Sequence, residues 1–99
     1  MPIMYFFLKL NPPRPTFAQD MSPEERDTMQ RHVAYWTDLM AKGTALVFGP
    51  VLDPKGVYGV GVIGVETDEQ RDAIIANDPA NGLNTYELYP MRAVVPRKN

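Results

Sequence analysis

The sequence predicts the α+β fold class, with one four-stranded antiparallel sheet that carries two helices on one face. Three observations support this expectation. The 99 residues suffice for one domain, residues 1–99, and leave no room for a second. The hydrophobic content of 44% and the charged content of 22% are those of a folded soluble protein. Strand-like and helix-like segments follow one another in the order βαββαβ.

The first strand is expected at residues 3–10, a run of bulky and aromatic side chains that suits a pleated surface. Pro12 and Pro13 lack the N–H groups that a sheet ladder needs, so strand pairing must stop there. Residues 11–21 are then expected to form a loop that the prolines keep extended. Loops of this length in compact domains often serve a function.

The first helix is expected to begin after Ser22, because a hydroxyl cap, Pro23 at the first helical position and Glu25 together form a capping box. Apolar side chains then recur every three or four residues and define one stripe, which His32 joins. The stripe consists of Met29, Val33, Trp36, Leu39 and Met40. Gly43 is expected to end the helix in the left-handed conformation.

Residues 45–52 and 57–65 are expected to form the second and third strands. The sequence between them, Asp53-Pro54-Lys55-Gly56, has the residues of a type I turn. Gly59, Gly61 and Gly64 spell the GxGxxG pattern of dinucleotide-binding proteins, but they lie inside a strand rather than between a strand and a helix. These glycines therefore indicate a bulge or a close approach of a helix.

Thr67 starts a second capping box, and the short helix that follows is expected to end at about Asn77, before Asp78-Pro79. Its buried face should include Ala73, Ile74 and Ile75. Residues 85–95 are expected to form the fourth strand, in which Pro90 indicates a bulge or a sheet edge. The complete order matches the ferredoxin-like split βαβ motif.

Both faces of the expected sheet are apolar, but the two helices can cover only one of them. Tyr5 and Phe7 point to one face of the first strand, whereas Met4, Phe6 and Leu8 point to the other. Each large apolar side chain left in water forfeits roughly 1.5 to 3 kcal/mol of stabilisation. We therefore expect a homodimer in which a second copy covers the open face.

The charge and composition exclude several classes of partner and chemistry. A net charge of −2 gives no general attraction to nucleic acid or to anionic membranes. The absence of cysteine excludes disulfides and thiolate metal sites, and it fits a cytoplasmic protein. The apolar start at residues 1–10 is too short to span a membrane. One histidine among scattered carboxylates predicts no metal site, and we expect no cofactor.

Several short motifs, taken in order, resemble the YCII-related (YciI-like) family over nearly the whole chain. The motifs are an aromatic first strand, Arg31-His32-Val33, Gly43, Phe48-Gly49-Pro50-Val51-Leu52-Asp53, Asp78-Pro79 and Tyr86-Glu87. The resemblance implies a dimeric α/β-barrel fold and a pocket that contains a histidine and an aspartate, which match His32 and Asp53 here. Some relatives act on ring compounds, including a dehydrochlorinase, and the wider superfamily includes muconolactone isomerase. After Asp78-Pro79 this chain departs from the family pattern, so the pocket wall is expected to differ there.

His32 and Asp53 are the candidate catalytic residues. His32 is the only histidine, and an imidazole exchanges protons readily near neutral pH, as a general base must. The alternative is a hydrogen-bonded core histidine on the apolar stripe. Asp53 would orient the imidazole and stabilise its protonated form. The alternative for Asp53 is the first position of the turn before Pro54.

Arg14, Thr16, Trp36 and Phe48 are the candidate substrate-binding residues. Arg14 offers a planar fork to an anionic group and Thr16 adds a hydroxyl, with solvated loop residues as the alternative. Trp36 and Phe48 would line a pocket for a flat apolar ligand, with core packing as the alternative.

The function predicted from these residues is that of a small-molecule enzyme of the lyase, isomerase or dehydrochlorinase type, in which a His–Asp pair performs acid–base chemistry on a ring-derived or oxo-acid substrate. The alternatives are a noncatalytic ligand-binding or regulatory domain and a purely structural dimerisation module. Fold alone does not choose among them.

Overall fold

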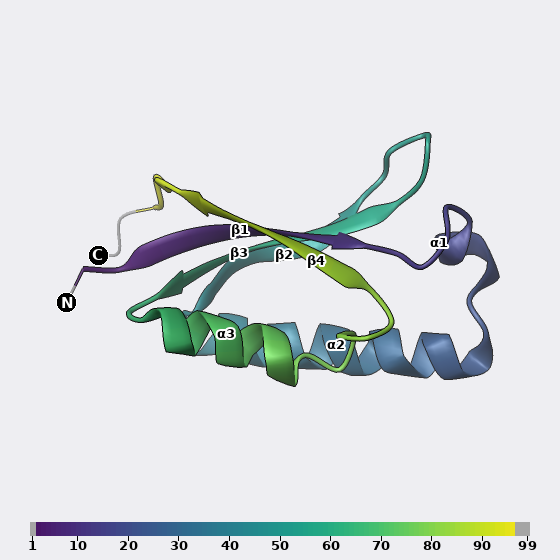
Figure 1. Ribbon diagram of the computed structural model, residues 1–99, viewed down its shortest axis with the longest axis horizontal. Coiled ribbons are helices and arrows are strands. Elements are labelled where there is room, and N and C mark those ends of the chain that lie inside the picture. Colours follow the sequence, from purple (N-terminus) through teal and green to yellow (C-terminus); the bar gives the residue numbers. More distant parts are fainter. Residues whose placement is uncertain (1, 97–99) are drawn as a thin grey trace.

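The structure is a computed structural model that describes residues 2–96. Its elements are β1 (Met4–Asn11), α1 (Phe17–Asp20), α2 (Pro23–Ala41), β2 (Ala45–Val51), β3 (Tyr58–Val65), α3 (Asp68–Asn77) and β4 (Thr85–Met91). The four strands form one antiparallel sheet in the order β2-β3-β1-β4. Helices α2 and α3 both lie on the same side of the sheet (Figure 1). The predicted α+β, ferredoxin-like architecture is thus confirmed.

Two segments differ from the sequence-based expectation. The expected loop at residues 11–21 contains the four-residue helix α1, because Phe17 turns inward and is only 5% exposed. Strand β4 ends at Met91 instead of residue 95. It is an edge strand, as Pro90 predicted, and Pro90 has no N–H with which to extend a ladder.

The helix ends are held by the predicted caps. The Glu25 N–H donates to Ser22 Oγ at 3.1 Å, and the Ser22 N–H donates to Glu25 Oε1 at 2.9 Å, which completes the capping box. Gly43 has a φ of +81° and ends α2 as expected. The second box is only half formed, because Thr67 Oγ1 accepts the Gln70 N–H while the Gln70 side chain accepts the N–H of Glu66.

The core fills the layer between the sheet and the two long helices. Its buried members are Phe6, Leu8, Leu10, Trp36, Leu39, Ala45, Ile63, Val65 and Ile74. The apolar stripe of α2 is rotated relative to the expectation, so that Val33 and Met40 are 50% and 41% exposed. Likewise, Ala73 of α3 is exposed.

The rotation of α2 follows from the contact between Trp36 and a strand glycine. A Cβ atom at Gly61 would lie 2.6 Å from two atoms of the Trp36 ring, so only glycine lets the indole lie against β3. The GxGxxG glycines of β3 therefore serve packing, as their position inside a strand predicted.

No helix lies over the opposite face of the sheet (Figure 1). The Phe7 and Tyr89 rings lie 6.3 Å apart on this face, and Tyr89 and Met91 are 47% and 40% exposed. The predicted open face is therefore present in the described part of the chain. Within residues 2–96, no helix combines the length and the apolar character needed to cross a membrane.

Candidate functional site

A cavity of about 370 Å³ opens between α2 and the end of the sheet that is nearest α1. The proline-rich segment, α2 and the hairpin of β2 and β3 each contribute to its wall. Representative side chains of the lining are Phe17, Met21, His32, Trp36, Phe48 and Asn84. The wall is predominantly apolar with a few polar groups, which is the usual character of a small-molecule site.

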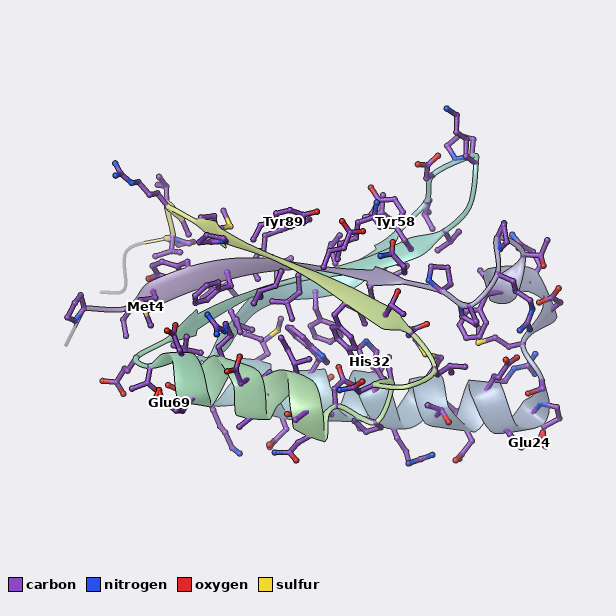
Figure 2. The ribbon with its side chains drawn as sticks, in the orientation of Figure 1. Met4, Glu24, His32, Tyr58, Glu69 and Tyr89 are labelled. Atoms are coloured by element: carbon purple, nitrogen blue, oxygen red, sulfur yellow. The ribbon has the colours of Figure 1, made fainter. Side chains whose placement is uncertain are left out.

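His32 is a titratable residue of the cavity wall. It lies on α2 and its side chain lies in the layer between that helix and the sheet (Figure 2). The imidazole Nδ1 lies 2.8 Å and 3.0 Å from the two carboxylate oxygens of Asp78. A carboxylate at Nδ1 favours the proton on that nitrogen, so Nε2 keeps its lone pair. Since His32 lines the cavity, Nε2 is the ring nitrogen available to a bound molecule.

Asp78 is buried directly after α3, with 1% of its side chain exposed. Besides the imidazole, it accepts the indole N–H of Trp36 at 2.7 Å and the backbone N–H of Ala80 at 2.9 Å. Burial raises the pKa of Asp78, but the hydrogen bonds from His32, Ala80 and Trp36 outweigh it, so the pKa lies below its ordinary value. Asp78 is therefore an anion that its hydrogen bonds hold beside the imidazole Nδ1.

Two tyrosines and an asparagine surround this pair. Burial and the Asp78 carboxylate raise the pKa of both Tyr35 and Tyr86, so both hydroxyls stay protonated. Tyr35 donates to the carbonyl of Ile74 at 2.8 Å. Within the described residues, the Tyr86 hydroxyl and Asn84 Oδ1 are buried without a hydrogen-bond partner. Unsatisfied buried groups of this kind are uncommon in native proteins.

The expected pairing of His32 with Asp53 is not what the structure shows. The carboxylate Oδ1 of Asp53 accepts the N–H of Lys55 at 2.9 Å, and its carbonyl accepts the N–H of Gly56. Asp53 thus serves the turn, which was its alternative interpretation. The carboxylate beside His32 is Asp78 instead, which directly follows α3.

Arg14 and Thr16 do not line the cavity, contrary to the expected substrate contacts. The Arg14 guanidinium donates to Asp20 and to both carboxylate oxygens of Glu25. Thr16 donates to the Asp20 carboxylate at 2.6 Å. The Arg14 side chain and the Ser22 N–H lower the pKa of Glu25 to about 2, so the ion pairs persist over the physiological range. Arg14 therefore fastens the loop to α2.

Trp36 and Phe48 do lie in the cavity wall, as expected, although their contact with a ligand stays a prediction. Their ring centroids are 5.8 Å apart. Trp36 is only 1% exposed and its indole N–H donates to Asp78, so it also has a structural role.

Sequence reasoning missed Asp78 as a site residue. The dipeptide Asp78-Pro79 was recognised as a family motif and as the end of a helix, which was the available signal. Four groups, on three segments of the chain, meet only after folding: His32, Trp36, Asp78 and Asn84. Within residues 2–96, no cluster of three or more histidine, cysteine, aspartate or glutamate side chains is arranged to hold a metal ion.

Comparison with known proteins gives a family and a fold. The sequence model of the YCII-related domain matches residues 5–94. No curated protein sequence matches significantly. Among solved structures, the chain is similar to 5-chloro-2-hydroxyhydroquinone dehydrochlorinase (TftG) from Burkholderia phenoliruptrix AC1100, in complex with 2,5-dihydroxybenzoquinone. The TM-score is 0.63 at 22% identity, over 88% of this chain and 93% of that one, and at this identity the likeness shows the fold.

Proposed function

This chain belongs to the YCII-related family, and from that premise we propose that it is a small-molecule enzyme in which His32 transfers a proton on a ligand held in the cavity. The observation that carries the proposal is the Nδ1 contact of His32 with the buried Asp78 at 2.8 Å, which leaves Nε2 for the ligand. A histidine that only packs also needs a hydrogen-bond partner for its buried nitrogen, but it does not need a cavity beside it.

The different roles of His32 and Asp78 follow from their charges. His32 Nε2 takes a proton from a C–H or O–H bond of the ligand, and the electron pair of that bond stays on the ligand. The Asp78 anion stabilises the imidazolium that forms, as orienting carboxylates do for other catalytic histidines. Trp36 holds Asp78 in place through its indole N–H.

Two reaction types are compatible with this proton transfer. In an isomerisation, the imidazolium returns the proton to a different atom of the ligand. In a dehydrochlorination of the kind named for TftG, the electron pair left by the proton drives out chloride, which departs with the pair of the C–Cl bond. The ring face would rest against Trp36 and Phe48, and neither reaction requires a cofactor.

The test is a substrate screen over chlorinated hydroquinones, ring-derived lactones and oxo acids, repeated with His32→Gln. Glutamine removes the base but keeps an N–H that can donate to Asp78, so the variant should fold. Loss of a general base should lower the rate by about 10²- to 10⁴-fold. Asp53→Ala is the matched control and should retain activity, because Asp53 serves the hairpin turn. Equal turnover by wild type and His32→Gln would refute the catalytic role.

A noncatalytic ligand-binding domain is the second candidate, since the cavity itself would serve either purpose. It predicts a ligand that binds to the wild-type protein and is released chemically unchanged. Turnover therefore separates the two candidates.

We also propose that the open sheet face forms a homodimer. The face presents apolar side chains from three neighbouring strands, including Phe7, Val62 and Tyr89, with no helix over them. Stable interfaces bury about 800 Å² on each partner, which a four-stranded sheet can supply. Light scattering at micromolar concentration tests this proposal, and a stable monomer would contradict it.

A further inference from the structure

The cavity wall lacks formal positive charge. None of the described residues that line it is a lysine or an arginine. Arg14, the cation of the neighbouring loop, is held by two carboxylates, Asp20 and Glu25. Lys9 lies on the other face of the sheet, with its ammonium 4.5 Å from the ring centroid of Tyr58. Within residues 2–96, the wall therefore offers an anion no lysine or arginine with which to pair.

The remaining charge near the cavity is that of the His32 and Asp78 pair. Asp78 is ionised because its hydrogen bonds hold the carboxylate as an anion. The pair has a charge of −1 when the imidazole is neutral and zero when it is protonated. Since the sum is never positive, the pair adds no net positive charge to the wall in either state. Transferring an anion from water to an apolar wall without a counterion is costly.

The hydrogen-bonding groups of the wall point to the same conclusion. The tautomer favoured by Asp78 makes His32 Nε2 an acceptor. Asn84 is 4% exposed, and its Nδ2 group lies 3.5 Å from the sulfur of Met29, which leaves Oδ1 without a donor. Among the described lining residues, His32 Nε2 and Asn84 Oδ1 are thus two acceptors that a ligand donor can satisfy. A ligand that carries hydroxyl or amide hydrogens can supply one, whereas a carboxylate cannot.

The volume limits the size of the ligand. An apolar cavity of about 150 Å³ is sufficient to hold benzene. The cavity of about 370 Å³ therefore accommodates one ring with its substituents. The Trp36 and Phe48 rings in the wall suit a flat molecule.

We propose that the ligand of this cavity is an uncharged, single-ring molecule that donates hydrogen bonds, and that the site discriminates against carboxylates. This inference rests on the proposed use of the His32 cavity but not on catalysis. It replaces the earlier expectation that Arg14 holds an anionic group, because that guanidinium is already occupied.

Three matched probes test the inference: benzamide, benzoate and methyl benzoate. They share one ring, but only benzamide donates hydrogen bonds and only benzoate is charged. The protein has one histidine and one tryptophan, so NMR signals of the His32 ring and the Trp36 indole report binding without further assignment. Benzamide should shift both signals and bind about tenfold more tightly than benzoate. Methyl benzoate should fall between the two, which separates the effect of charge from that of the missing donor.

A gain-of-function variant adds a second test. Leu52 lines the cavity and is 79% exposed, so Leu52→Arg should fold and place a cation at the rim. It should strengthen benzoate binding, whereas the matched variant Leu52→Gln should not. Unchanged benzoate binding in Leu52→Arg would argue that charge does not control entry.

The inference is overturned if wild type binds benzoate as tightly as benzamide, or if benzamide leaves both signals unmoved up to its solubility limit. These binding results do not decide whether the proposed function is correct. Selective binding of neutral rings without any turnover would keep the inference and reject the enzyme. Turnover of carboxylate substrates alone, with loss in His32→Gln, would do the reverse.

Discussion

Replacing Asp78 with alanine should destabilise the protein strongly, although the residue is a single carboxylate near the end of a helix. The structure gives the reason. Asp78 accepts the Trp36 indole N–H at 2.7 Å and the Ala80 N–H at 2.9 Å, and both donors belong to residues with at most 1% exposure. Alanine leaves both donors buried without an acceptor.

The expected size follows from these two groups. A buried donor without a partner costs about 1 to 3 kcal/mol, so the loss in the free energy of unfolding should be about 2 to 6 kcal/mol. This is a large part of the usual stability of a domain, about 5 to 15 kcal/mol. Asp78→Asn keeps one carbonyl oxygen and should therefore lose less, which provides a variant that still folds.

Urea denaturation followed by circular dichroism at fixed protein concentration measures the effect. The matched control is Asp53→Ala, which removes only an exposed hydrogen bond to the Lys55 N–H and should cost about 0.5 to 1.5 kcal/mol. If the two alanine variants lose the same stability, Asp78 does not organise the buried network.

Three further outcomes are expected. Gly61→Ala should lower the free energy of unfolding by about 1 to 3 kcal/mol in a urea titration, because its Cβ would lie 2.6 Å from the Trp36 ring; a neutral result would mean that the helix shifts freely. The pKa of Asp78 is lowered in the folded state, so its stabilising effect is complete above its ordinary pKa of 3.8 and is lost as the pH falls through the folded value. The difference in urea midpoint between wild type and Asp78→Asn should thus be constant near neutral pH and shrink in acid, and a difference that grows in acid would contradict this sign. Finally, Val62→Lys, which places a charge opposite Phe7 on the open face, should convert the proposed dimer to a monomer in light scattering, whereas an unchanged mass would place the interface elsewhere.

Local sequence signals accounted for the fold because each of them acts within a few residues. The Ser22 to Glu25 capping box and the left-handed Gly43 fix the two ends of α2 through hydrogen bonds to neighbouring residues. Alternation along β1 separates a buried face from an open one. The end of β4 was missed because strand length at an edge depends on whether a partner strand continues, which no local signal states.

The site was predictable only in part. His32, Trp36 and Phe48 were identified from their residue types and their place in the chain, and all three line the cavity. The partner of His32 was not, since Asp53 and Asp78 both precede a proline and look alike in sequence. Nothing local distinguishes a carboxylate that serves a turn from one that accepts hydrogen bonds from a distant helix.

The sequence by itself determined the order of the four strands and the two long helices, the N-terminal cap of α2 and the presence of two apolar sheet faces, because these depend on periodicity and on contacts between neighbours. Only the tertiary structure decided which carboxylate meets the imidazole, which aromatic ring lies on Gly61 and whether Arg14 is free. The His32 and Asp78 groups are 46 residues apart in the chain. Their contact depends on the rotation of α2, which Trp36 sets by packing against the sheet.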